Sequence, residues 1–269
     1  MEHQKIIEDL TASYKHIFAD QLTNGQINWA QNKVSNPREF VSPTIPFVGV
    51  NYTSQKTKIL LYASAENLAG YNGHLDDDIK AINRHRWYND NIQREFFPWV
   101  HIAPITDGSL LIVLKYICEK LGIITPDTPK EFVESIAFAN FGKFSILASS
   151  NNIDYAQSKS KLDCSMPYIE CDLKVLQPDV IVMFNTIYTT ERSLLDEWKG
   201  DARIIGLTQI NARTVNTNLK RRFALKDEAD LSPVIRAWYD VKYFHENKFT
   251  NKTHKNFLSV FTYLDTIVK

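Results

Sequence analysis

Two apolar segments in the middle of the chain most constrain its fold. Ser135–Ser145 (SIAFANFGKFS) and Cys171–Asn185 (CDLKVLQPDVIVMFN) each run an apolar stretch into an asparagine, at Asn140 and at Asn185. A short apolar run of this kind is typical of a strand that is buried in a parallel sheet. Each strand would carry an amide to its carboxyl end, where α/β folds hold their ligands. We therefore expect an α/β protein with a binding cleft near these two asparagines.

The composition excludes several classes of protein. A chain of 269 residues with 44% hydrophobic residues is able to bury a sizeable core, so it is not a disordered protein. Its 31 basic and 31 acidic residues balance, and no strong overall field attracts nucleic acid. Any binding of nucleic acid must therefore come from a local basic patch.

The chain has no sequence signal for export, for a membrane or for a metal cluster. Its first residues, MEHQKIIEDL, are polar, and the longest apolar run, Leu110–Leu114, is far shorter than the ~20 residues of a membrane span. The three cysteines, Cys118, Cys164 and Cys171, form no CxxC pair, which suits a reducing compartment and is one short of an iron–sulfur ligand set. We expect a cytoplasmic monomer with no cofactor, no metal and no membrane contact.

The pattern of apolar residues predicts alternating strands and helices. In residues 1–20, four apolar residues at helical spacing predict an amphipathic helix: Ile6, Leu10, Tyr14 and Ile17. Residues 21–56 contain three prolines and no sustained period, which indicates an extended arm. Strands are predicted at Lys58–Ala63, Ser135–Asn140, Val180–Phe184 and Arg203–Leu207. Helices are predicted at residues 76–97, at Thr106–Leu121, around Met166–Leu176, at Thr189–Trp198 and at the carboxyl end, around Phe257–Ile267.

This alternation predicts the fold class. Strands separated by helices favour a three-layer α/β/α arrangement with a central, largely parallel sheet of about four strands. We expect a single domain, in which residues 1–56 form the helix and arm, residues 57–211 the core, and residues 212–269 a basic segment and the last helix.

Four blocks between about residues 47 and 211 resemble the uracil-DNA glycosylase superfamily, in a divergent, uncharacterised branch. In chain order they read KILLYASAENLAGY, SIAFANFGKFS, LKVLQPDVIVMFN and RIIGLTQIN. In the same order, the blocks are similar to four elements of that family: the first strand with its substrate loop, the base-reading strand, the helix-to-strand block, and the segment that holds the His-Pro-Ser motif. The resemblance implies a glycosylase-like fold and excision of a modified or deaminated base from DNA.

The resemblance also implies roles for individual residues. Glycosylases extrude the target nucleotide and read the Watson–Crick edge of its base with an amide. Asn140 corresponds to that amide, which offers both a donor and an acceptor. The other residues expected to line the substrate site are Ser64, Tyr71, Phe141 and Asn185, and Phe144 is a further aromatic candidate for stacking on the base.

Catalysis would fall to two loops. Glu66 is expected to act as a general base and Asn67 to position water. Where the family carries its histidine, this chain reads Thr208-Gln209-Ile210-Asn211, so Gln209 or Asn211 would donate a weaker, neutral hydrogen bond to the departing base. The missing histidine leaves two alternatives open: an inactive member that binds nucleic acid or a nucleotide in the same cleft, and an unrelated α/β enzyme that acts on a small molecule.

A basic cluster after the last predicted strand is the local support for a DNA or nucleotide partner. It contains Arg213, Lys220, Arg221, Arg222 and Lys226, with Asn211, Asn216 and Asn218 interleaved. We expect the first four of these cations to contact the nucleic-acid backbone, and the alternative is a solvated basic face. Two acidic groups are not expected to form a functional site. Asp76–Asp78 suit the start of a predicted helix better than a metal site. Glu170 and Asp172 fall on a predicted helix, whereas the nuclease motif that they resemble would place them on a strand.

Overall fold

A computed structural model describes residues 2–26, 45–65, 106–143, 159–184, 195–239 and 251–269. The chain divides into two compact units. The first comprises residues 1–90 and 136–206, and the second comprises residues 91–135 and 207–269. No described helix has both the length and the apolar character that a membrane crossing requires.

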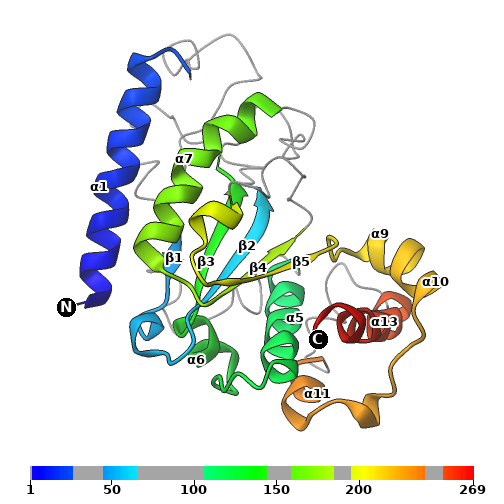
Figure 1. The fold of residues 1–269 in the computed structure, drawn as a ribbon. Helices are drawn as coiled ribbons and strands as arrows, with labels where there is room; N and C mark the ends of the chain where they lie inside the picture. Colours follow the sequence, from blue (N-terminus) through cyan, green and yellow to red (C-terminus); the bar gives the residue numbers. More distant parts are fainter. Residues whose placement is uncertain (1, 27–44, 66–105, 144–158, 185–194, 240–250) are drawn as a thin grey trace. The chain divides into compact units, whose positions relative to one another are not determined.

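A mixed five-stranded sheet organises the first unit (Figure 1). Its order is β1-β3-β2-β4-β5, and the strands are β1 (Phe47–Val48), β2 (Ile59–Ala65), β3 (Ala137–Gly142), β4 (Val180–Phe184) and β5 (Arg203–Leu207). β3 and β4 both run parallel to β2, whereas β1 pairs antiparallel with β3 at the edge. The fold is therefore α/β. The expected sheet of about four strands gains a fifth, antiparallel strand from the segment that was predicted to be an extended arm.

The order of the strands creates a switch point at β2. The chain passes from β2 to β3 on one side and later to β4 on the other side. The backbone N–H groups of Asp179 and Val180 donate to the carbonyl of Lys58, so β2 and β4 begin side by side. In open α/β sheets, ligands bind outside the carboxyl ends of the strands at such a point. This rule predicts a ligand site at the carboxyl ends of β2, β3 and β4.

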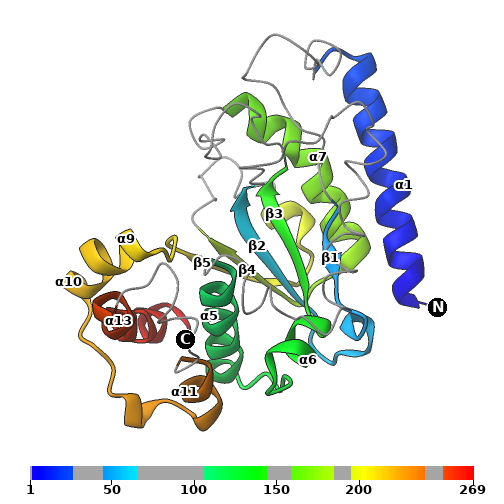
Figure 2. The ribbon, with the colours of Figure 1, turned by 180° about the vertical axis from the view of Figure 1, so that it is seen from behind.

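Two helices cover one face of this sheet. Helix α1 (Glu2–Thr23) lies alongside α7 (Lys159–Leu176), and both views agree on this arrangement (Figure 1 and Figure 2). Leu10, Tyr14 and Phe18 of α1 are buried, and the ring of Tyr14 packs edge-on against that of Tyr168 at 4.8 Å. The predicted amphipathic helix is confirmed, and its partner is α7.

Helices predominate among the described residues of the second unit. Its longer helices are α5 (Thr106–Lys120) and α13 (Asn251–Ile267), and shorter ones are α6 (Pro129–Glu134) and α11 (Pro233–Tyr239). α5 contacts both α11 and α13 (Figure 2), and the core includes a pair of rings, Tyr116 and Phe261, at 4.8 Å. A helical segment packs on α13 and comprises α9 (Ala212–Thr214), the π-helical turn η4 (Val215–Leu219) and α10 (Lys220–Arg222). Two single 3-10 turns complete the elements: η2 (Tyr52–Ser54) in the first unit and η5 (Glu228–Asp230) in the second.

Most of the predicted elements are confirmed. The four predicted strands correspond to β2 through β5, and the helices predicted at Thr106–Leu121, around Met166–Leu176 and at the carboxyl end correspond to α5, α7 and α13. Gly122 ends α5 as expected, with a φ of 67° that an L side chain adopts only under strain. The helix predicted over residues 76–97 lies outside the described residues, as does most of the one at Thr189–Trp198. The three-layer arrangement remains a prediction.

Candidate functional site

The predicted base-reading residue lies near the carboxyl edge of the sheet. Asn140 is half-buried in β3 and pairs in register with Ala63 of β2. Ser64 is the last residue but one of β2. Five further predicted residues of this cleft lie outside the described residues: Glu66, Asn67, Tyr71, Phe144 and Asn185. Their convergence with Asn140 therefore remains a prediction.

Phe141 belongs to the core. Its side chain is fully buried and packs edge-to-face on Tyr62, with the ring centroids 5.6 Å apart and the planes at 90°. Because side chains alternate along a strand, Phe141 points to the face opposite Asn140. No face of its ring is exposed, and the expected contact between Phe141 and a substrate stays a prediction.

A fully buried ion pair lies on the same face of the sheet as Phe141. Lys143 Nζ is 2.6 Å from Asp172 Oδ2, and the two side chains are 1% and 0% exposed. The hydroxyl of Tyr14 donates to Asp172 Oδ1 at 2.7 Å, and that of Tyr62 donates to Oδ2 at 2.9 Å. The ammonium also lies 5.5 Å and 5.6 Å from the centroids of these two rings. We call these four residues the buried tetrad.

The electrostatics of the buried tetrad indicate a structural role. Burial, followed by the charge of Asp172 and the hydrogen bond to it, raises the pKa of Tyr14 and of Tyr62 well above the usual value. Both phenols therefore keep the protons that they donate. Burial also raises the pKa of Asp172, while Lys143 and the two tyrosines oppose that shift. The tetrad joins α1, β2, α7 and the end of β3 and is closed to a ligand.

The sequence contained a signal for the buried tetrad. Asp172 lies three residues after Ile169 and four before Leu176, so it falls on the apolar face of α7. A carboxylate on such a face needs a buried partner, because an unpaired buried charge is very costly. The partner, Lys143, is the basic residue that follows the Asn140 strand.

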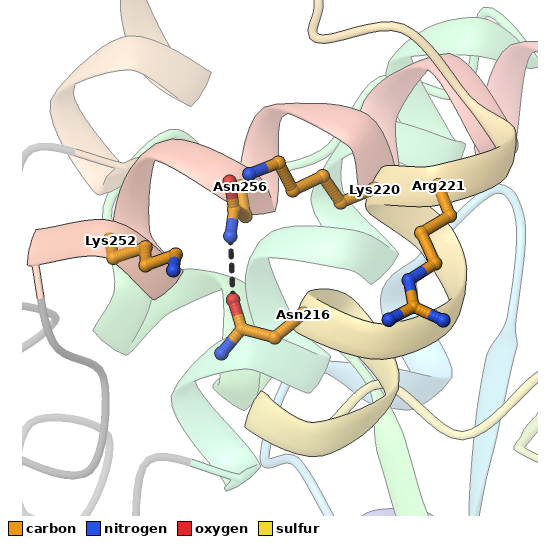
Figure 3. Close-up of a pocket in the computed structure, with 5 residues that line it drawn as sticks. All are labelled: Asn216, Lys220, Arg221, Lys252 and Asn256. Atoms are coloured by element: carbon orange, nitrogen blue, oxygen red, sulfur yellow. Dashed lines mark hydrogen bonds between the residues drawn. The ribbon is translucent and has the colours of Figure 1, made fainter.

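A basic pocket lies in the second unit (Figure 3). It has a volume of about 380 Å³, and its lining residues are Asn216, Lys220, Arg221, Lys252 and Asn256. The first three come from η4 and α10, and the last two come from α13. The side chain of Asn256 donates from Nδ2 to Asn216 Oδ1 at 2.6 Å, and Asn216 Nδ2 donates to Thr253 Oγ1 at 2.7 Å. These bonds hold the two segments together at the wall of the pocket.

The three cations of the basic pocket have no acidic partner in the part of the chain that the structure describes. Lys220, Arg221 and Lys252 are exposed, and none of them forms an ion pair with any residue that the structure describes. Residues 207–226 and 251–264, which contain the lining residues, include no aspartate or glutamate. The positive charge of the pocket is therefore not neutralised by its own segments.

The π-helical turn shapes this pocket. The N–H of Lys220 bonds to the carbonyl of Val215, an i→i+5 bond in place of the usual i→i+4 bond. The wider turn holds one extra residue, so Lys220 and Arg221 both follow Asn216 by about one turn. Single π turns inside helices occur frequently at functional sites.

The remaining predicted residues after β5 have different surroundings. Gln209 is exposed, and Asn211 caps α9, since its Oδ1 accepts from the N–H of Thr214 at 2.8 Å. Arg213 and Arg222 are exposed but do not line the pocket. Lys226 pairs with Asp265 at 2.6 Å, so its charge is neutralised.

Comparisons with protein families, with curated proteins and with solved structures find no match to this chain. Across the part of the chain that the structure describes, no group of three or more His, Cys, Asp or Glu residues is arranged to hold a metal ion. The evidence for a function therefore comes from the geometry of the described residues, the basic pocket above all.

Proposed function

We propose that the protein binds nucleic acid and that the basic pocket holds its phosphate groups. The observation that carries this proposal is the convergence on one concave site of three cations that form no ion pair with the described residues: Lys220, Arg221 and Lys252. Arginine provides a planar fork that matches two phosphate oxygens, and lysine provides a compact positive charge. A phosphate in this pocket would supply the missing negative charge.

The nearby cations extend this surface. Arg213 and Arg222 are exposed on the same helical segment, so a strand that enters the pocket is able to contact them through its backbone. Contacts to phosphate carry little sequence information, and they release counterions. We therefore expect binding that depends strongly on salt and weakly on sequence.

A titration with labelled single- and double-stranded oligonucleotides at low salt tests the proposal. Lys220→Glu combined with Arg221→Glu should weaken binding by at least about tenfold, because two attractive contacts become repulsive. Lys56→Glu combined with Lys130→Glu is the matched control, because it makes the same change in net charge at two exposed lysines outside the pocket. The proposal fails if the wild-type protein binds neither oligonucleotide, or if both double variants weaken binding equally.

A second proposed function is excision of a base at the carboxyl edge of the sheet. The half-buried position of Asn140, paired with Ala63 near the end of β2, favours it, since the resemblance to uracil-DNA glycosylases gives Asn140 the base edge to read. Glu66 and Asn67 would activate water, and Gln209 or Asn211 would assist departure of the base.

The test is release of free base from DNA that contains uracil, hypoxanthine or an oxidised pyrimidine. We expect the wild-type protein to release base, and Asn140→Ala to do so at least about a hundredfold more slowly. The variant would leave the polar edge of the base without hydrogen-bond partners in the closed site, which is strongly unfavourable. Binding of DNA without any release of base would leave the first proposal intact and would assign the protein to the inactive alternative.

A further inference from the structure

We infer that the basic pocket recognises a phosphate monoester, either the terminal phosphate of a strand or the phosphate of a free nucleotide. This inference rests on the proposed binding of nucleic acid and names the group that the pocket selects. Three observations lead to it: the number of cations, their convergence from two segments, and a buried amide in the pocket wall.

The charge of the pocket favours a monoester over an internal phosphodiester. Three cations line the pocket, and residues 207–226 and 251–264 provide no acidic group to neutralise them. An internal diester carries one negative charge, whereas a phosphate monoester carries about −1.5 to −2 near pH 7 and has three terminal oxygens. The monoester therefore satisfies more of the positive charge at one place.

The arrangement of the cations supports the same choice. Lys220 and Arg221 belong to α10, whereas Lys252 belongs to α13, and all three line one pocket (Figure 3). Cations that follow a continuous backbone would form a row along a groove, because each phosphate of the strand is displaced from the next. Convergence on one site suits a single group of high charge.

The buried amide supplies a contact beside the phosphate. Asn256 is 3% exposed and lines the pocket, and the only hydrogen bond that its side chain makes with the described residues runs from Nδ2 to Asn216 Oδ1. Its Oδ1 therefore retains the capacity to accept a hydrogen bond from a ligand. The hydroxyl of an adjacent sugar is a suitable donor. The volume of about 380 Å³ exceeds that of one phosphate and falls in the range of small-ligand sites.

Competition between oligonucleotides tests the inference. One short single strand is prepared in three forms, with a 5′-phosphate, with a 3′-phosphate and with hydroxyls at both ends, and a nucleoside 5′-monophosphate is a fourth ligand. We expect at least one phosphorylated strand, or the free nucleotide, to bind about tenfold more tightly than the hydroxyl strand. Displacement of the phosphorylated strand by the free nucleotide identifies the nucleotide as sufficient, whereas preference without displacement identifies the strand end.

Two exposed arginines of the second unit provide the matched variants. Arg221→Gln should abolish the preference for the terminal phosphate, because Arg221 lines the pocket. Arg236→Gln removes the same charge from a position on α11 outside the pocket, so the preference should persist. Equal binding of all three strands, with no tighter binding of the free nucleotide, overturns the inference and leaves the proposed function standing. Loss of the preference to the same extent in both variants also overturns it, and absence of any binding at low salt removes both proposals.

Discussion

The buried tetrad and the basic pocket use lysine in opposite ways. In the tetrad, Lys143 is 1% exposed, contacts Asp172 at 2.6 Å and lies near two aromatic rings. In the pocket, Lys220 and Lys252 are exposed and have no acidic partner among the described residues. The charge of the first lysine is paired within the fold, and the other two lysines retain their capacity to bind an anion.

Because of this difference, the tetrad lysine should matter for the stability of the fold, and the pocket lysines for the binding of a ligand. A buried charge is costly unless it is paired, so the loss of its partner should damage the fold. An exposed charge is stabilised by water, so its loss should spare the fold and affect only an anionic ligand. The two regions therefore predict opposite outcomes for substitutions of the same kind of side chain.

The largest effect is expected from Asp172→Asn. This change leaves Lys143 buried without a countercharge and should lower the free energy of unfolding by about 3–5 kcal/mol. Urea denaturation measures the loss. Glu170→Gln removes the acid of an exposed i,i+4 pair on the same helix and should leave the denaturation midpoint nearly unchanged.

A double variant covers the case in which Asp172→Asn does not fold. Asp172→Leu combined with Lys143→Met replaces the ion pair with apolar groups of similar volume, and it should be more stable than either single change. If Asp172→Asn were as stable as the wild type, the buried tetrad would not stabilise the fold.

A smaller effect is expected at alkaline pH. The raised pKa of Tyr14 lets the folded protein keep a proton that the unfolded chain loses above about pH 10. Its contribution to stability is therefore complete below that pH and is lost as the pH rises. Tyr14→Phe should reduce the slope of stability against pH by up to about 1.4 kcal/mol per pH unit above pH 10. Urea denaturation midpoints of the wild type and of Tyr14→Phe, measured between pH 9 and 11, check this result. If the midpoints of the two proteins changed equally with pH, Tyr14 would ionise in the folded state at its ordinary pKa, which contradicts the prediction.

The smallest change in stability is expected from the pocket. Lys220→Gln combined with Arg221→Gln should alter the free energy of unfolding by less than about 0.5 kcal/mol, since both side chains are exposed and form no ion pair among the described residues. Thermal denaturation checks this result. A loss as large as that of Asp172→Asn would show that these cations hold the fold together and would remove the contrast between the two regions.

The sequence predicted local elements better than the contacts between them. β4 was predicted with its observed bounds, because Pro178 and the apolar run Val180–Phe184 define it locally. The pairing of Lys143 with Asp172 joins residues that are 29 positions apart, and Tyr14 is 158 positions from Asp172. Such contacts depend on the packing of α1 and α7 on the sheet, which no local pattern specifies.

Only part of the basic pocket could be predicted from the sequence. The cluster that contains Lys220 and Arg221 was recognised because its residues are close along the chain. Lys252 and Asn256 lie about 30 residues later, and only their i,i+4 spacing on the last helix indicated a shared face. The fold was needed to bring the two segments together, and it also removed Lys226 from the cluster through its pairing with Asp265.

The salt dependence of binding to a single-stranded oligonucleotide tests the central claim most directly. If Lys220, Arg221 and Lys252 contact phosphate, the slope of log K against log salt should be about −2 or steeper for the wild-type protein, at about −0.7 for each neutralised phosphate charge. Replacing all three by glutamine should make the slope shallower by about 2. An unchanged slope in the triple variant would contradict the assignment of the basic pocket to phosphate.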